Sequence, residues 1–340
     1  MAVEKISIEQ LFELQKDRVI IDVRTPAEFA QGHISGAFNL PLFTDEERIV
    51  VGTIYKKQSP EKALLKGLEF TGKKMPGYIK KARKIAPDKK LIVHCWRGGK
   101  RSGSMAWLLD LAGFDVVTIE GGYKAYRSLI HNFFEKPFHF KVLGGKTGTG
   151  KTEILKNMES CGSQVIDLEG LANHKGSAFG ALGQLPQPFT EQFENLLFER
   201  LRTMDVSKPI WVENESRGIG KVFIPQGIWD QMRQSILYIV EIPHELRLQR
   251  SVNDYQSDNK EELMEVFRKI ERKLGGKQCQ EAIQALEKND YNSAAEIALV
   301  YYDKTYQFSQ DRSTFSEIKQ FVFDHADMMK IARVLSDTDK

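Results

Sequence analysis

One short stretch of the sequence, HCWRGGKRS at residues 94–102, combines a cysteine with glycines and basic residues. Cys95 follows an apolar run, Leu91–Val93, which predicts a buried parallel strand. A glycine-rich loop at the end of such a strand can direct backbone N–H groups towards the sulfur, and nearby positive charge favours thiolate over thiol. We interpret Cys95 as a reactive thiolate in an anion-binding loop that also contains Arg97, Gly98, Gly99, Lys100, Arg101 and Ser102.

The residues after this loop, Met105–Ala112, have the spacing of a buried helix, and Ser102 is placed to cap it. A buried structural cysteine is the alternative interpretation of Cys95. Three basic residues and two glycines within six positions favour the reactive thiolate.

A second stretch fits the phosphate-binding pattern G-x-x-x-x-G-K-[ST]. It lies between a predicted strand at 138–143 and a predicted helix from 153, the setting that the pattern requires. Lys151 would reach terminal phosphates, and Thr152 could hold a magnesium ion. We expect no tightly bound cofactor. The predicted phosphate-binding residues are Gly145, Lys146, Gly148, Gly150, Lys151 and Thr152.

Four further residues are weaker candidates in the second half. Glu213 follows the predicted strand at 209–212, where an acid can bind a magnesium-bound water, although a surface acid fits as well. Arg217 lies in a basic, glycine-containing loop. Arg247 and Arg250 are three apart on a predicted helix, so they share a face. They could form a phosphate lid or a solvated face.

The composition suits a globular protein, with 41% hydrophobic and 28% charged residues. A length of 340 residues predicts two domains. Cys95, Cys161 and Cys279 form no CxxC pair, so neither a disulfide framework nor a zinc site is indicated. With no apolar leader and no run long enough to span a bilayer, we expect a cytoplasmic protein without membrane contact.

Although the formal net charge is only +3, basic residues are concentrated between 73 and 90. Lys80, Lys81 and Lys84 represent this window. The window could be a solvated helical face or a surface that meets a phosphate backbone.

In the first half, predicted strands at 19–21, 91–93 and 116–119 alternate with predicted helices. One helix is expected at 6–14, and Thr25-Pro26 marks the start of another. In the second half, strands are expected at 138–143, 164–169, 209–212, 236–241 and 321–323, and helices at 191–204, 260–303 and 326–335. Such alternation predicts α/β folds with parallel sheets flanked by helices. We place the domains at 1–133, with an insertion at about 43–86, and at 138–340.

The first domain resembles the rhodanese family over roughly residues 1–132. The resemblance rests on ordered matches at 22–24, 28–29, 32–34, 36–37 and 39–41, which read DVR, EF, GHI, GA and NLP. It implies a loop cysteine that carries sulfur or selenium as a persulfide or perselenide. The insertion, which contains Gly67, is longer than the ordinary link of this family.

The cysteine loop departs from typical sulfurtransferases, because five residues separate Cys95 from Arg101, one more than usual. The same loop fits the signature of cysteine phosphatases, in which arginine binds a phosphate through two parallel hydrogen bonds. A cysteine-dependent phosphatase or sulfurtransferase, fused to a regulatory nucleotide-binding P-loop domain, therefore stays open as an alternative.

The whole chain resembles the bacterial tRNA 2-selenouridine synthase family. Besides the pairing of a rhodanese-like domain with a nucleotide-kinase-like P-loop domain, the stretches at 168–176 and 211–217 carry this resemblance. It implies a transferase that converts 2-thiouridine at the tRNA wobble position to 2-selenouridine. Geranyl diphosphate first alkylates the sulfur, and selenophosphate then supplies selenium. Cys95 would be the perselenide carrier, and Lys80, Lys81 and Lys84 would support tRNA binding. An enzyme that supplies selenophosphate is an implied partner, and we expect a monomer.

Overall fold

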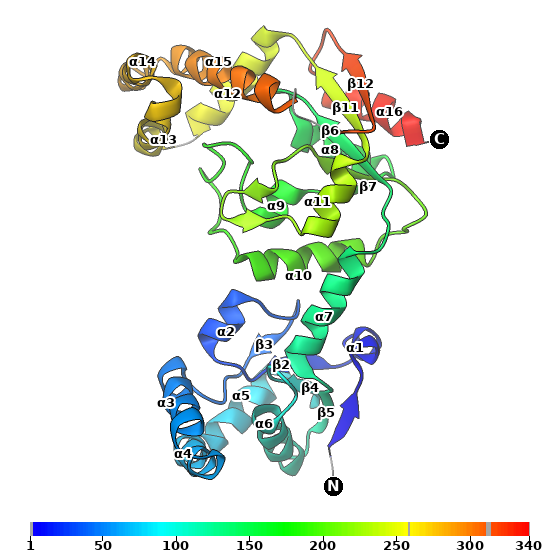
Figure 1. The fold of residues 1–340 in the computed structure, drawn as a ribbon, viewed down its shortest axis with the longest axis vertical. Coiled ribbons are helices and arrows are strands. Elements are labelled where there is room, and N and C mark those ends of the chain that lie inside the picture. Colours follow the sequence, from blue (N-terminus) through cyan, green and yellow to red (C-terminus); the bar gives the residue numbers. More distant parts are fainter. Residues whose placement is uncertain (1–2, 258, 311–313, 340) are drawn as a thin grey trace. The chain divides into compact units, whose positions relative to one another are not determined.

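A computed structural model describes residues 3–257, 259–310 and 314–339. The chain divides into two compact units, Met1–Phe133 and Phe134–Lys340. Each unit contains a five-stranded parallel sheet with helices around it (Figure 1). This arrangement confirms the predicted α/β class.

The first sheet has the strand order β1-β5-β4-β2-β3 and places the cysteine loop near its middle. Leu91, Ile92 and Val93 of its central strand are fully buried, as expected where helices cover both faces of a parallel sheet. The strands are β1 (Glu4–Ile6), β2 (Val19–Asp22), β3 (Phe38–Asn39), β4 (Lys90–His94) and β5 (Asp115–Ile119).

Four helices accompany the strands of this unit: α1 (Ile8–Leu14), α2 (Pro26–Gln31), α6 (Lys100–Leu111) and α7 (Gly122–Phe134). The predicted helix at 6–14 was wrong at its start, because Ile6 pairs with Ile119 in the sheet. Ser7 then begins α1 with a capping box. Thr25 begins α2 in the same way, with a proline at the first turn, which confirms the predicted start signal.

The insertion forms three helices, and only the last lies in the lysine-rich window for which a helical face was one interpretation: α3 (Asp45–Lys57), α4 (Pro60–Gly72) and α5 (Met75–Ile85). Helix α3 packs on α4 at the margin of the unit (Figure 1). Gly67 is buried in α4, where an added Cβ would lie 3.2 Å from the Phe43 ring, so its small size serves packing. The Tyr78 hydroxyl of α5 donates to the Leu42 carbonyl at 2.7 Å and attaches this helix to the core.

The second sheet has the order β12-β11-β6-β8-β7, with β6 in the middle. Its strands are β6 (Phe140–Gly144), β7 (Gln164–Ile166), β8 (Ile210–Glu213), β11 (Ile236–Glu241) and β12 (Glu317–Val322). The predicted strand at 164–169 was too long, since Asp167 caps a short helix, α9 (Leu168–Ala172). An unpredicted antiparallel hairpin, β9 (Gly218–Ile219) and β10 (Val222–Phe223), follows β8.

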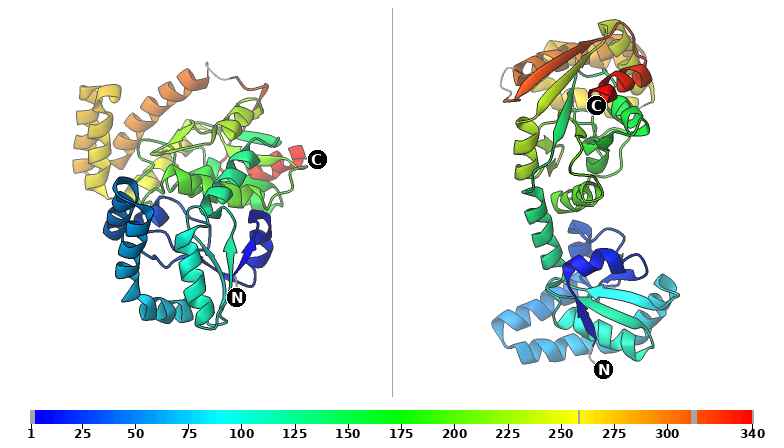
Figure 2. Two further views of the ribbon diagram at one scale, coloured as in Figure 1. Left: turned by 60° about the horizontal axis from the view of Figure 1, so that its bottom comes forward. Right: turned by 90° about the vertical axis from the view of Figure 1, so that its right-hand side faces the viewer.

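The helices of the second unit are α8 (Lys151–Ser160), α10 (Thr190–Leu201), α11 (Gln226–Arg233), α12 (His244–Ser257), α13 (Lys260–Leu274), α14 (Gly276–Glu287), α15 (Tyr291–Gln310) and α16 (Met328–Ser336), with a 3-10 turn at Asp337–Asp339. One apolar core joins α8 and α16 to the sheet, and another lies among α12–α15. Figure 2 shows α13 and α14 beside α15, set apart from the strands. Within the described part of the chain, no helix is both long and apolar enough to cross a membrane.

Candidate functional site

The cysteine loop begins directly after β4 and closes on the start of α7. The backbone N–H of Tyr123 donates to the Cys95 carbonyl at 2.9 Å. Gly98 has a φ of 66°, and a Cβ at this position would lie 2.6 Å from the Ile119 carbonyl oxygen. Both the backbone conformation and this close approach require glycine at position 98.

The sulfur of Cys95 lies inside this loop, and the residue is only 3% exposed. Its Sγ is 3.2 Å from the hydroxyl oxygen of Ser102. Burial alone would raise the pKa of the thiol, but hydrogen bonds from the Ser102 hydroxyl and N–H and from the Arg97 N–H lower it. The charge of Arg101 acts in the same direction, so the pKa of Cys95 lies below its ordinary value. This environment favours the thiolate of a nucleophile.

Ser102 is not the helix cap that its position predicted. Helix α6 begins at Lys100, with Gly99 as the N-cap residue, so Ser102 lies in the first turn of the helix. Its hydroxyl oxygen lies 3.1 Å from the Gly99 carbonyl oxygen and within hydrogen-bond distance of the Cys95 sulfur. Because the helix begins before Ser102, this side chain is directed towards Cys95.

The basic side chains of the loop differ in their surroundings. Arg97 and Lys100 are exposed. The guanidinium of Arg101 forms two hydrogen bonds with the Glu28 carboxylate, at 2.6 and 3.2 Å. The phosphatase interpretation has Arg101 bind phosphate through two hydrogen bonds. In this structure both hydrogen bonds go to Glu28 of α2 instead, while the positive charge of Arg101 stays close to the thiol.

Buried polar groups hold the neighbouring strand ends beneath the loop. Arg24 donates to the Asp22 carboxylate at 2.6 Å and to the Gly32 carbonyl at 2.6 Å. Its guanidinium carbon lies 3.8 Å from the centre of the Tyr123 ring. Since both charged side chains are fully paired, these rhodanese-like residues support the loop rather than act on a ligand.

Replacing Ser102 with alanine is expected to raise the pKa of Cys95, since the thiolate loses a hydrogen bond. Ultraviolet absorbance of the thiolate across pH, with the spectrum of Cys95→Ala subtracted, should titrate at a higher pH than in the wild type. Ser104→Ala is the matched control, because the Ser104 hydroxyl donates to the Arg101 carbonyl and not to sulfur. An unchanged midpoint in Ser102→Ala would contradict the assigned role.

The phosphate-binding pattern occupies its expected setting between β6 and α8. Gly145, Gly148 and Gly150 have φ values of 155°, 81° and 83°. Such conformations suit glycine, and in a loop of this kind they allow N–H groups to point inward. The Lys151 ammonium donates to the Gly145 carbonyl at 3.1 Å, so the lysine side chain lies across the loop. A phosphate chain bound in this loop would contact the same ammonium. The geometry is that of an anion cradle at a helix N-terminus.

Three glutamates surround the base of this loop. The Thr152 hydroxyl donates to Glu169 at 3.1 Å, and the Leu168 N–H donates to Glu213 at 3.1 Å. Glu213 is 0% exposed, which rules out the surface-acid alternative. Burial, followed by the charge of the neighbouring carboxylates, raises the pKa of Glu213 well above its usual range and that of Glu215 to about 8. Burial also raises the pKa of Glu169.

These oxygen donors are of the type that magnesium prefers. One oxygen of Glu213, Oε1, is buried without a hydrogen-bond partner among the described residues. Nevertheless, across residues 3–257, 259–310 and 314–339 no three histidine, cysteine or acidic side chains are grouped to hold a metal ion.

The two arginines of α12 meet carboxylates rather than open solvent. Arg247 is only 4% exposed; it donates to the Thr147 carbonyl at 2.9 Å and to both oxygens of Asp303. Arg250 donates to Glu153 at 2.6 Å. The interpretation of α12 as a solvated face was wrong for Arg247, and direct phosphate contact by either residue stays a prediction.

The other predicted residues remain near the surface. Arg217 is exposed before the β9–β10 hairpin, and its carbonyl accepts the Ile224 N–H at 2.8 Å. Lys80, Lys81 and Lys84 are all exposed on α5, with Tyr78 and Ala82 on its buried side.

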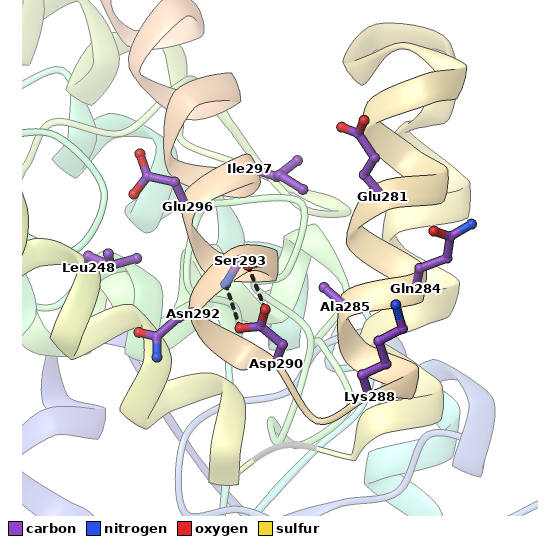
Figure 3. A pocket seen from close by; sticks show the side chains of 10 residues that line it. All are labelled: Leu248, Glu281, Gln284, Ala285, Lys288, Asp290, Asn292, Ser293, Glu296 and Ile297. Atoms are coloured by element: carbon purple, nitrogen blue, oxygen red, sulfur yellow. Dashed lines mark hydrogen bonds between the residues drawn. The ribbon is translucent and has the colours of Figure 1, made fainter.

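A surface pocket lies among α12, α14 and α15, and no predicted site residue lines it (Figure 3). Asp290 at its edge accepts two hydrogen bonds from Ser293. The residues that line it are Leu248, Glu281, Gln284, Ala285, Lys288, Asp290, Asn292, Ser293, Glu296 and Ile297.

Sequence patterns missed four acidic residues at the two cradles: Glu28, Glu169, Glu215 and Asp303. Glu28, Glu169 and Glu215 occur in the stretches that carry the family resemblances. Those patterns do not indicate that Glu28 meets Arg101 or that Glu169 meets Thr152. Asp303 lies in a helical region without a recognisable motif. No local signal in the sequence identifies it as a partner of Arg247.

Comparison with known proteins adds two matching family models and several similar full-length proteins. A model described as the tRNA 2-selenouridine synthase AAA domain matches residues 138–336, and a rhodanese-like domain model matches residues 7–129. The tRNA 2-selenouridine synthase of Sulfurovum sp. (strain NBC37-1) is 34% identical, covering 86% of this chain and 89% of its own length. That of Shewanella frigidimarina (strain NCIMB 400) is also 34% identical, covering 93% and 96%. That of Nitrosomonas europaea is 40% identical over 70% of this chain and 64% of its own length.

Proposed function

Because the chain belongs to the tRNA 2-selenouridine synthase family, we propose that it converts 2-thiouridine to 2-selenouridine at the wobble position of tRNA. The reaction uses geranyl diphosphate and then selenophosphate. The observation that carries this proposal is the presence of two anion cradles on one chain, one built around a thiol of lowered pKa and the other around a P-loop.

Two cradles suit this reaction because thiolate is a poor leaving group from a thiouridine. Alkylation converts the thiocarbonyl into a thioether, so selenium can attack C2 of the base while the C2–S bond breaks and geranyl thiolate leaves. The first step therefore needs a site that stabilises a departing diphosphate, and the second needs a site for a selenium anion. These are separate electrostatic tasks.

The P-loop would perform the first task. Its inward N–H groups and the ammonium of Lys151 bind the diphosphate and stabilise the negative charge that develops as the bond to the geranyl carbon breaks. If magnesium is bound beside Thr152, it supplies further positive charge to the diphosphate. Burial and the neighbouring carboxylates raise the pKa of Glu213 well above its usual range. They raise the pKa of Glu215 to about 8, which favours its protonated form near neutral pH and lessens its repulsion of the anion.

The cysteine loop would perform the second task. The Cys95 thiolate attacks the selenium of selenophosphate: the S–Se bond of a perselenide forms, and the P–Se bond breaks with its electron pair leaving on phosphorus. The N–H groups that lower the pKa of the thiol stabilise the terminal anion of the perselenide. After this selenium has displaced geranyl thiolate from C2 of the base, an external thiol cleaves the S–Se bond by forming a disulfide with Cys95. Arg97 and Lys100 are exposed and attract the phosphate group of the donor.

Nucleoside analysis of thiolated tRNA tests the proposal directly. Geranyl diphosphate alone should produce S-geranyl-2-thiouridine, selenophosphate alone should leave 2-thiouridine unchanged, and the two together should produce 2-selenouridine. Selenouridine formed at full rate from selenophosphate alone would contradict the two-step order. Release of phosphate from a generic aryl phosphate would instead favour the phosphatase alternative.

Charge reversal at Lys80, Lys81 and Lys84 is expected to weaken tRNA binding, because their exposed ammonium groups would neutralise backbone phosphates. The slope of log affinity against log salt should become shallower by about two to three, if each lysine meets one phosphate. Filter binding across salt concentrations measures this slope. A matched control reverses three exposed lysines of the other unit: Lys269, Lys273 and Lys277. Equal slopes for the two triple variants would identify α5 as an ordinary solvated face.

A further inference from the structure

Helix α12 supports the P-loop through a buried arginine. The Nε of Arg247 donates to the Thr147 carbonyl at 2.9 Å, in the middle of the loop. Its two terminal nitrogens donate to the Asp303 carboxylate of α15 at 3.0 and 2.6 Å. All three nitrogens of the guanidinium are thus used, and the planar group has one orientation in which it satisfies both partners.

The backbone of the same loop lies directly against α12. Gly148 has a φ of 81°, and an added Cβ would lie 2.8 Å from the Arg247 carbonyl and 3.1 Å from the Ser251 hydroxyl. The loop segment at 147–148 therefore contacts α12 both through close packing and through a charged hydrogen bond. A shift of the guanidinium would release the carbonyl at position 147.

Asp303 also lies near a second cation of the loop. The Lys146 ammonium is 3.9 Å from its carboxylate, and this lysine side chain is 45% exposed. The Arg247 side chain by contrast is 5% exposed, so the carboxylate of Asp303 faces one buried and one accessible positive charge. The accessible one is free to turn towards an incoming anion.

We propose that Arg247 and Asp303 are positioning residues that hold the P-loop in the conformation that binds a diphosphate. Asp303 orients the guanidinium, the guanidinium fixes the carbonyl of Thr147, and the N–H groups of the loop stay directed inward. The inference rests on the proposed function for the identity of the diphosphate substrate. It assigns to α15, through Asp303, a role in binding that substrate.

The test uses the full chain and two variants, Asp303→Asn and Arg247→Lys. Asp303→Asn keeps the size of the side chain but removes the charge that pairs with the guanidinium. Arg247→Lys keeps the positive charge but replaces the three nitrogens of the planar guanidinium with one, so the geometry of the paired contacts is lost. We expect the Kd for inorganic pyrophosphate and the KM for geranyl diphosphate to rise roughly 10- to 100-fold, as for loss of a charged hydrogen bond at a binding site, with a smaller change in kcat. The Kd and KM of the double variant should be no higher than those of the more impaired single variant, because both substitutions break the same interaction.

Glu296→Gln provides the matched control. Glu296 accepts a hydrogen bond from His244 at 2.8 Å, so this pair also joins α12 to α15, but it lines the surface pocket of Figure 3. We expect its KM and Kd to equal those of the wild type. If Glu296→Gln raises them as much as Asp303→Asn does, the effect comes from helix packing and the proposal is wrong.

Two further results would also overturn it: unchanged pyrophosphate affinity in a folded Asp303→Asn protein, or additive losses in the double variant. Thermal unfolding identifies folded variants. A wild-type chain that binds pyrophosphate but forms no S-geranyl nucleoside would contradict the proposed function, while the pyrophosphate titrations would still decide the positioning role.

Discussion

Replacing Lys151 with alanine is expected to abolish the formation of S-geranyl-2-thiouridine. Lys151 begins α8, and its ammonium already lies across the loop, 3.1 Å from the Gly145 carbonyl. Its ammonium would stabilise the charge of a departing diphosphate together with the N–H groups of the loop, so we expect a rate loss of at least about 10²–10³-fold, typical of losing one preorganised electrostatic contact. Mass spectrometry of nucleosides after incubation of thiolated tRNA with geranyl diphosphate measures this rate.

Lys156→Ala is the control for this variant, because Lys156 is an exposed lysine on the same helix. It should geranylate tRNA at the wild-type rate. Unchanged product from Lys151→Ala would remove the P-loop from the reaction. If ATP competes with geranyl diphosphate in the wild type but not in Lys151→Ala, the same cradle can also accept nucleotides.

Replacing Cys95 with alanine is expected to eliminate 2-selenouridine while S-geranyl-2-thiouridine accumulates. The two cradles lie in different compact units, so loss of the thiol leaves the P-loop intact. Without a nucleophilic sulfur there is no covalent carrier for selenium, and the second step should fall to the background rate. Nucleoside analysis with both donors present distinguishes accumulation of the intermediate from loss of both steps.

Cys161→Ala is the corresponding control, since Cys161 is an exposed thiol in the second unit. It should form selenouridine at the wild-type rate. Selenouridine at that rate from S-geranyl tRNA and selenophosphate with Cys95→Ala would show that Cys95 is not the carrier.

Both cradles were predictable from the sequence because their parts are close together along the chain. Residues 94–102 and 145–152 are each continuous, and each follows a short apolar strand. Strand pattern, glycine conformation and helix start signals depend on near neighbours. Even so, Ser102 was misplaced as a cap, since the helix begins two residues earlier and turns its hydroxyl towards sulfur.

The partners of the charged side chains could not be predicted, because these contacts join residues that are far apart in the sequence. Arg101 meets Glu28 across 73 positions, and Arg247 meets Asp303 across 56. Periodicity can place each of these residues on a strand end or a helix face, but it cannot say which helices pack together or which side chains then meet. The packing of α2 on the cysteine loop and of α12 and α15 on the P-loop determines whether an arginine faces a substrate or holds the loop that binds it. The amino-acid pattern thus specifies the two anion cradles, and the three-dimensional fold assigns the side chains that shape them.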